Sequence, residues 1–228
     1  MKYPIYKPRF FPNTQKYVND CLDTTWISSK GSYIKKFETS FANYLSVNYA
    51  TSVNNGTAAL HMCLCALGIG EGDEVIVPTF TYIASVNAIK YVGAEPIFVD
   101  SDKATWNLDV TFLDSLITKK TKAIMAVHLY GNPCDMDALR GLCDKRNIYL
   151  IEDVAEALGS SYKGQFLGTF GDVSSFSFFG NKTITTGEGG MVVSNNKEII
   201  DKVISLKNQG ASENKYWYEE VGYNYRMT

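Results

Sequence analysis

The stretch SSFSFFGNKTITTGEGGM, which covers Ser174 to Met191, sets a single lysine in a run of small and polar residues between two predicted strands. The first strand, Val173 to Phe178, is rich in β-branched and aromatic residues. After a glycine pair, Met191 to Ser194 predicts a strand that runs back. Lys182 therefore lies just past a strand end, where an amine can be desolvated and made nucleophilic toward a carbonyl carbon. A surface lysine in an ordinary loop is the alternative, and the rest of the chain decides between the two.

Outward from this stretch, strands and helices alternate along the chain. Apolar periodicity predicts helices over 14–23, 33–45, 57–67, 108–117 and 137–146, and strands over 50–53, 74–77, 96–100, 122–127 and 149–152. Such alternation is typical of βαβ units, which build a mostly parallel sheet. We expect an α/β fold in which residues 14–228 form one domain. Residues 1–13 carry three prolines among aromatic residues and predict an extended N-terminal arm.

Composition excludes several classes of protein. With 228 residues, 45% of them hydrophobic, the chain can bury a full α/β core. A net charge of -2 without long like-charge runs predicts no binding to nucleic acid or to an anionic membrane. No stretch nears the roughly 18 consecutive apolar residues of a spanning helix, and a cytoplasmic protein is expected. Five cysteines without CxxC spacing and only two histidines indicate neither a disulfide framework nor a metal site.

One predicted strand-to-helix turn carries the sequence NNGT. The strand that ends near Val53 breaks at Gly56 into a helix that begins at Thr57. Unpaired backbone N–H groups and the positive end of the helix dipole make such a turn a natural seat for a phosphate. An ordinary capped helix is the alternative for this turn alone.

Two further strand ends carry candidate side chains. Phe80 and Tyr82 follow a predicted strand, where an aromatic ring can stack on a planar ligand, although core packing of one of them is equally expected. Asp153 and neighbouring carboxylates follow the strand that ends at Glu152, and ligands of open α/β folds bind at this edge. An acid that abuts an apolar strand is often held by a partner, so we expect a functional role for Asp153.

Together these features describe a pocket for a phosphorylated aromatic aldehyde. Pyridoxal 5'-phosphate needs a lysine for a Schiff base, an aspartate that keeps the ring nitrogen protonated, a stacking ring and donors for the phosphate. The chain resembles the DegT/DnrJ/EryC1/StrS family of sugar aminotransferases, within fold-type I of the enzymes that use this cofactor. The motifs that carry the resemblance are NGTAAL at Asn55, GDEVIVPTFTYIASVNAI at Gly72, AVHLYGNPCDM at Ala126, EDVAEALGSSYKG at Glu152, SFSFFGNKTITTGEGG at Ser175 and GYNYRM at Gly222.

The resemblance implies a three-layer α/β/α domain with a mostly parallel central sheet, and it implies roles for the residues around the cofactor ring. Lys182 would be the catalytic residue, bound to the cofactor and then moving the proton during transfer. Asp153 would pair with the ring nitrogen, while Tyr82 and Ala155 would pack on the two ring faces. Glu156 would also bind the cofactor, although some relatives have His or Gln there and its role stays open. A lysine at 182, where dehydratase relatives have histidine, favours transamination.

The resemblance also implies how the cofactor phosphate is held. Gly56, Thr57 and Ala58, at the helix start, would bind it together with Ser177. Asn224 would reach the phosphate of the neighbouring subunit, so the resemblance implies a homodimer with active sites at the interface.

The implied reaction moves an amino group from L-glutamate to a nucleotide-linked keto-deoxysugar used in O-antigen or polysaccharide biosynthesis. The run FFGNKTITTGEGG resembles the perosamine-forming branch of the family, which favours GDP-4-keto-6-deoxy-mannose as acceptor and GDP-perosamine as product. The alternative is an aminotransferase that acts at C3 or C4 of a dTDP- or UDP-linked keto sugar. A non-catalytic α/β binding module and an inert fragment are alternatives of other classes. The family's small C-terminal domain is expected to be absent from this chain.

Overall fold

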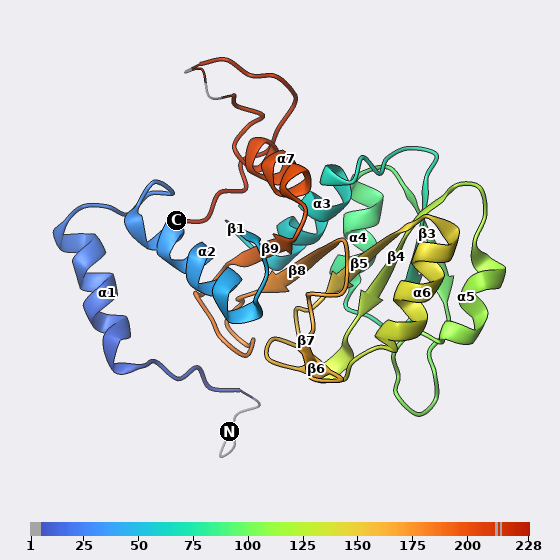
Figure 1. Ribbon diagram of the computed structural model, residues 1–228. Helices are drawn as coiled ribbons and strands as arrows, with labels where there is room; N and C mark the ends of the chain where they lie inside the picture. The colour runs from blue at the N-terminus through green and yellow to red at the C-terminus, as the bar shows by residue number, and fades with distance from the viewer. Residues whose placement is uncertain (1–5, 213, 215) are drawn as a thin grey trace.

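A seven-stranded sheet lies at the centre of the molecule (Figure 1). The computed structural model describes residues 6–212, 214 and 216–228, so the first five residues of the predicted arm lie outside the described part. The strands follow the order β1-β9-β8-β5-β4-β2-β3 across the sheet. They are β1 (Tyr49–Val53), β2 (Glu74–Pro78), β3 (Glu95–Val99), β4 (Thr121–Val127), β5 (Tyr149–Asp153), β8 (Val173–Ser177) and β9 (Gly190–Ser194).

The sheet is parallel except at one strand. β5 pairs in parallel with both β4 and β8, and β2 does so with β3 and β4. In the described part of the chain, β9 alone runs against its neighbours, β8 and β1. The strand predicted to run back after the lysine loop is therefore confirmed, and the loop lies at the carboxyl end of β8.

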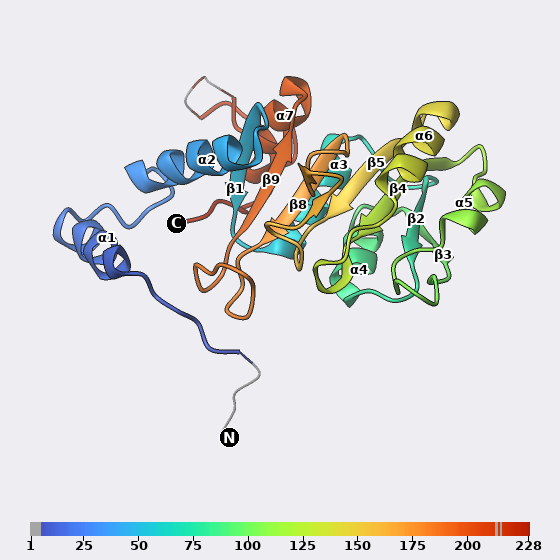
Figure 2. The same ribbon diagram turned by 60° about the horizontal axis from the view of Figure 1, so that its bottom comes forward.

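Helices cover both faces of the sheet, so the three-layer α/β/α arrangement is confirmed (Figures 1 and 2). One face carries α3 (Gly56–Ala66), α4 (Ile83–Tyr91) and α7 (Lys197–Lys207), whose apolar side chains join one core cluster. The other face carries α2 (Ser32–Leu45), α5 (Val110–Leu116) and α6 (Met136–Arg146), which join a second cluster. Most predicted elements are found with their ends moved by one or two residues, because capping decides the ends and periodicity does not.

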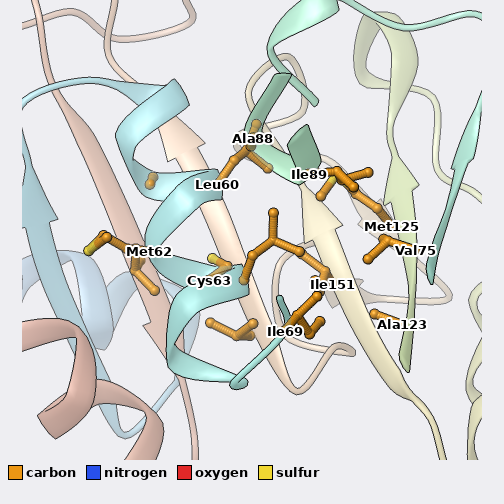
Figure 3. Packing of buried hydrophobic residues seen from close by; sticks show 14 of the residues in the cluster. Leu60, Met62, Cys63, Ile69, Val75, Ala88, Ile89, Ala123, Met125 and Ile151 are labelled. Atoms are coloured by element: carbon orange, nitrogen blue, oxygen red, sulfur yellow. The ribbon is translucent and has the colours of Figure 1, made fainter. Parts of the chain in front are cut away.

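The first cluster packs between α3, α4 and the middle strands (Figure 3). Val75, Met125 and Ile151 of three adjacent strands are fully buried under Leu60 and Ile89 of the two helices. Because parallel strands have helices on both sides, their side chains are buried on both faces, and the central residues of β2, β4 and β5 are apolar. Polar side chains are therefore concentrated where these strands end.

The N-terminal segment stands apart from this core. α1 (Pro12–Asp23) begins two residues earlier than predicted, because Pro12 is tolerated at the first helical position, where no N–H is required. The last two residues assigned to the arm are thus helical, which corrects its boundary. No residue of α1 is buried, and in Figure 2 the helix and the preceding extended residues project away from the sheet.

Short elements that the sequence did not predict lie between β4 and β8. β6 (Ser161–Tyr162) and β7 (Gln165–Phe166) form a two-stranded hairpin, and a 3-10 turn covers Leu129–Gly131. Two paired residues per strand are too few to create a periodic pattern in the sequence.

Candidate active site

A cavity of about 630 Å³ opens at the carboxyl ends of β5 and β8, against the N-terminal ends of α3 and α4. Nine of the ten residues predicted for the site line it. They are Gly56, Thr57, Ala58, Tyr82, Asp153, Ala155, Glu156, Ser177 and Lys182. The structure thus brings residues that span 127 positions of the sequence, counted from 56 to 182, to one edge of the sheet.

The start of α3 forms one wall of this cavity. The Asn55 side chain caps the helix by accepting the N–H of Ala58 at 2.8 Å, while the N–H groups of Gly56 and Thr57 have no acceptor within the helix. Gly56 lies directly against Ser177, because a Cβ atom at residue 56 would stand 2.7 Å from the Ser177 Cβ and 2.9 Å from its hydroxyl. Glycine therefore keeps two N–H groups and a hydroxyl together in a space suited to an anion.

Lys182 lies in the loop that follows β8. Its side chain is 21% exposed, and its Nζ lies 4.0 Å from Oε1 of Glu156. The other carboxylate oxygen of Glu156 accepts the backbone N–H of Tyr130 at 2.9 Å. Tyr130 has a left-handed backbone, with φ of 51°, which a non-glycine residue adopts only when its surroundings hold it there. Glu156 therefore links a constrained turn to the lysine.

Asp153 is the last residue of β5 and is 6% exposed. Its Oδ2 accepts the hydroxyl of Ser85 at 2.8 Å, and its Oδ1 accepts the N–H of Ala155 at 3.1 Å. Burial raises the pKa of this carboxyl, while the two donors and the positive charge of Lys182 oppose that rise. With two donors for about four acceptor positions, the carboxylate retains capacity for a ligand in the cavity.

The two aromatic residues considered for stacking have separate surroundings. Tyr82 immediately precedes α4, lines the cavity and is 75% exposed, as a residue at the cavity mouth would be. Phe80 instead packs edge to face on Trp106, with 6.0 Å between ring centroids. Phe80 is 44% exposed and lies outside both core clusters, so this contact is at the surface and the core-packing alternative is wrong for Phe80.

The neighbouring acid, Glu152, points to the other face of the sheet. Its carboxylate accepts hydrogen bonds from His128 Nε2 at 3.1 Å and from the N–H groups of Gly168, Phe170 and Gly171. Although burial opposes it, these hydrogen bonds hold the pKa of Glu152 below its ordinary value. His128 Nδ1 accepts the N–H of Cys134, so the ring proton lies on Nε2 and is donated to the carboxylate.

Asn224 is the predicted site residue that the structure leaves outside the cavity. It is exposed, pairs through its backbone with Asn208, and accepts a hydrogen bond from Arg226 at 2.8 Å. Its predicted role toward a second subunit remains a prediction.

Sequence reasoning missed Thr81 and Ser85, which join Asp153 in a hydrogen-bonded series. Thr81 Oγ1 lies 2.8 Å from Ser85 Oγ, which in turn lies 2.8 Å from Asp153 Oδ2. Two hydroxyl residues close to a predicted helix start were the available signal, since such residues often bind at helix ends. The sequence could not show which strand end these hydroxyls meet.

Two negative findings apply to the described ranges, 6–212, 214 and 216–228. Within them, no group of three or more histidine, cysteine, aspartate or glutamate side chains is arranged to hold a metal ion. No helix there combines the length and the apolar character required to cross a membrane.

Comparison with known proteins gives close relatives along the whole chain. GDP-perosamine synthase of Escherichia coli O157:H7 is 63% identical over 230 residues, which cover 100% of this chain and 63% of that protein. GDP-perosamine synthase of Vibrio cholerae is 58% identical over 226 residues, with 99% and 62% covered. The chain thus spans less than two thirds of the length of these relatives.

A solved structure gives the same comparison in three dimensions. The PLP-form of a putative sugar aminotransferase, Spr1654 from Streptococcus pneumoniae, superimposes with a TM-score of 0.92 at 34% identity, covering 99% of this chain and 63% of that one. The model of one protein family matches residues 11–228 of this chain. The chain belongs to the DegT/DnrJ/EryC1/StrS aminotransferase family.

Proposed function

We propose that this chain is a pyridoxal phosphate-dependent aminotransferase that moves an amino group from L-glutamate to GDP-4-keto-6-deoxy-mannose and forms GDP-perosamine. One observation carries the proposal: Lys182 and the buried carboxylate of Asp153 share one cavity with an anion seat at Gly56, Thr57 and Ser177. The choice of sugar is supported by relatives named GDP-perosamine synthase, at 63% and 58% identity.

The residues present fit the cofactor. Gly56 lets the start of α3 approach Ser177 closely, because a Cβ there would clash with that side chain. The approach brings unpaired N–H groups together with the hydroxyls of Thr57 and Ser177, which suits a phosphate. A buried carboxylate that keeps acceptor capacity suits a protonated ring nitrogen. Tyr82, exposed at the mouth, and Ala155 supply a ring and a small side chain for the two faces of a planar group.

Each residue then has a task in the transfer. Bound pyridoxal phosphate supplies an aldehyde carbon that exchanges amino groups and a ring that withdraws electrons. Lys182 Nζ would hold the cofactor through that carbon and, once freed, would take and return the proton that moves during transfer. Asp153 would hold the proton on the ring nitrogen, and Glu156, whose Oε1 lies 4.0 Å from Nζ, would orient the amine. Glutamate and the keto sugar would use the same site in turn.

The proposal extends to the assembly and its location. A homodimer is supported by the exposed apolar side chains of the N-terminal segment, Phe10, Phe11, Val18 and Leu22, which a partner surface could cover. It is also supported by Asn224, which lies outside the cavity of its own chain. A cytoplasmic location is supported by the five cysteines, all of which are unpaired.

The test is an acceptor profile. The purified protein, loaded with pyridoxal phosphate, is incubated with L-glutamate and one of three 4-keto-6-deoxy sugars, linked to GDP, dTDP or UDP, and the amino sugar is measured by mass spectrometry. The proposal expects product from the GDP-linked sugar. Product from the dTDP- or UDP-linked sugar alone would transfer the assignment to that acceptor, and cofactor binding without any transfer would favour a binding module.

A further inference from the structure

A closed polar cluster lies behind Asp153, on the side of α4. Ser85 is fully buried, and its Oγ lies 2.8 Å from Asp153 Oδ2. Thr81, four residues earlier and just before α4, lies at the cavity wall with its Oγ1 2.8 Å from the same Ser85 oxygen. Asp153 thus faces the cavity, while a series of two hydroxyls runs from Thr81 at the cavity wall through the buried Ser85 to its Oδ2.

The direction of these hydrogen bonds follows from the chemistry of the groups. An ionised carboxylate only accepts, so the single proton of Ser85 is donated to Asp153. The lone pairs of Ser85 are then free to accept the proton of Thr81, whose other acceptor, the Tyr82 carbonyl, is farther away at 3.3 Å. Each hydroxyl polarises the next, which strengthens the bond that reaches the carboxylate.

This arrangement favours one charge state of Asp153. Burial alone favours the neutral acid, and its pKa is raised for that reason. The Ser85 hydroxyl on one oxygen and the Ala155 N–H on the other both donate to the carboxylate. A proton on either oxygen would compete with one of these donors, so the series opposes the effect of burial.

We propose that Ser85, supported by Thr81, is a positioning residue that keeps Asp153 ionised and its free lone pairs turned into the cavity. The inference rests on the proposed function, in which Asp153 holds the ring nitrogen of the cofactor. Ser85 itself lines no part of the cavity, so it acts through Asp153 alone. Loss of the Ser85 hydroxyl should therefore change when Asp153 is charged, without removing any cofactor contact.

The matched control is Ser174. It is also a buried serine, 1% exposed, and its hydroxyl donates to a buried carboxylate, Glu152, at 3.3 Å. Glu152 faces the other side of the sheet and lines no part of the cavity. Ser85→Ala and Ser174→Ala therefore make the same chemical change beside two adjacent acids.

The experiment measures the dissociation constant of pyridoxal phosphate between pH 5 and pH 9 for the wild type, Ser85→Ala, Ser85→Thr and Ser174→Ala. A hydrogen bond to a charged group is worth about one pKa unit. The acid limb, which is the pH range in which affinity for pyridoxal phosphate is lost on acidification, should therefore move upward by about one pH unit in Ser85→Ala. Ser85→Thr, which keeps the hydroxyl, should restore the limb, and Ser174→Ala should leave it in place. An acid limb that Ser85→Ala does not move would overturn the inference.

A second variant covers the case in which Ser85→Ala does not fold. Thr81→Val changes a half-buried position and removes only the outer hydroxyl, and it should move the acid limb in the same direction by a smaller amount. No movement in that variant would contradict the series. Failure of the proposed cofactor role is distinguishable, because then the wild type itself would show no covalent binding of pyridoxal phosphate at any pH. Failure of the proposed transfer reaction is read from the acceptor profile and leaves this binding measurement unchanged.

Discussion

Glu152 and Asp153 are adjacent buried carboxylates on β5, yet the two faces of the sheet give them different surroundings. Glu152 accepts five donors, namely His128, the hydroxyl of Ser174 and three backbone N–H groups of the loop after β7. Asp153 accepts two. Because a carboxylate offers about four acceptor positions, Glu152 is fully used within the protein and Asp153 is not.

We interpret this difference as one between a structural acid and the acid proposed to hold the cofactor. A buried charge with every acceptor position occupied holds segments together, and its neighbours leave no room for a ligand. A buried charge with free lone pairs beside a cavity is costly to keep unless something binds it. Substitutions at the two residues should therefore affect different measurements.

The largest effect is expected for Asp153→Asn. An amide cannot hold the ring-nitrogen proton as a carboxylate does, so turnover should fall about 10²- to 10⁴-fold. The free energy of unfolding at neutral pH should stay the same or rise, since the substitution removes a buried charge. Steady-state kinetics and urea unfolding measure the two quantities. Asp144→Asn, at an exposed carboxylate of α6, is the control and should leave turnover unchanged. Unaffected turnover in Asp153→Asn would remove it from the reaction.

Glu152→Gln should give the converse result. The amide replaces one acceptor oxygen by an NH₂ group that faces N–H donors, which leaves buried groups unsatisfied. The free energy of unfolding should fall by about 3 kcal/mol, measured by urea unfolding, with cofactor affinity of the folded protein much less affected. A variant as stable as the wild type would show that the five contacts to Glu152 do not hold the loop.

Two glycines extend the comparison to the backbone. Gly56→Ala places a Cβ against Ser177 on the cavity side, and overpacking of about 1–3 kcal/mol should appear mainly as weaker binding of pyridoxal phosphate. Gly171→Ala places a Cβ 2.7 Å from the Leu150 carbonyl on the other side and should lower stability instead. Equilibrium dialysis and urea unfolding of both variants give the two readings. Equal losses of affinity for pyridoxal phosphate in the two variants would contradict the assignment of the cofactor to the Gly56 side and of a structural role to the Gly171 side.

The smallest effect is a difference in pH dependence. The folded pKa of Glu152 is held low, so its contribution to stability is complete above its unfolded value of about 4.3 and is lost as pH falls through the folded value. The stability gap between wild type and Glu152→Gln should therefore close toward acid pH. The folded pKa of Asp153 is raised, so Asp153→Asn should gain stability over the wild type as pH rises. Urea unfolding of the cofactor-free proteins at several pH values measures the stability of each variant minus that of the wild type. This difference should fall with rising pH for Glu152→Gln and rise for Asp153→Asn, and the same sign of slope in both variants would contradict the assignment.

Much of this fold and of the site could be predicted from the sequence, because both depend on the order in which apolar runs and the polar residues after them follow one another along the chain. Apolar runs give the strands, and the residues after each run share the carboxyl edge of a parallel sheet. This reasoning alone brought Thr57, Tyr82, Asp153 and Lys182 to one place. Order along the chain does not show which of the adjacent residues Glu152 and Asp153 faces the cavity. Adjacent side chains of a strand point to opposite faces, and a strand that is buried on both faces does not mark in its sequence which face is which.

Contacts between distant segments could not be predicted. Ser85 meets Asp153 only because the start of α4 lies beside the end of β5, and no local sequence pattern shows that these two segments are neighbours. His128 and Glu152 meet because their strands are neighbours in the sheet, 24 residues apart in sequence. The position of Asn224 outside the cavity also depends on tertiary packing, through its pairing with Asn208.

The most direct test of the central claim is to locate the lysine that binds the cofactor. The protein is incubated with about one equivalent of pyridoxal phosphate, reduced with borohydride, digested and mapped by mass spectrometry. Lys207 is the natural competitor, because burial lowers the pKa of its amine, yet it donates to Thr51, Ser52 and Glu38 away from the cavity. The account predicts the label on Lys182. A label on Lys207, or none on Lys182, would contradict it.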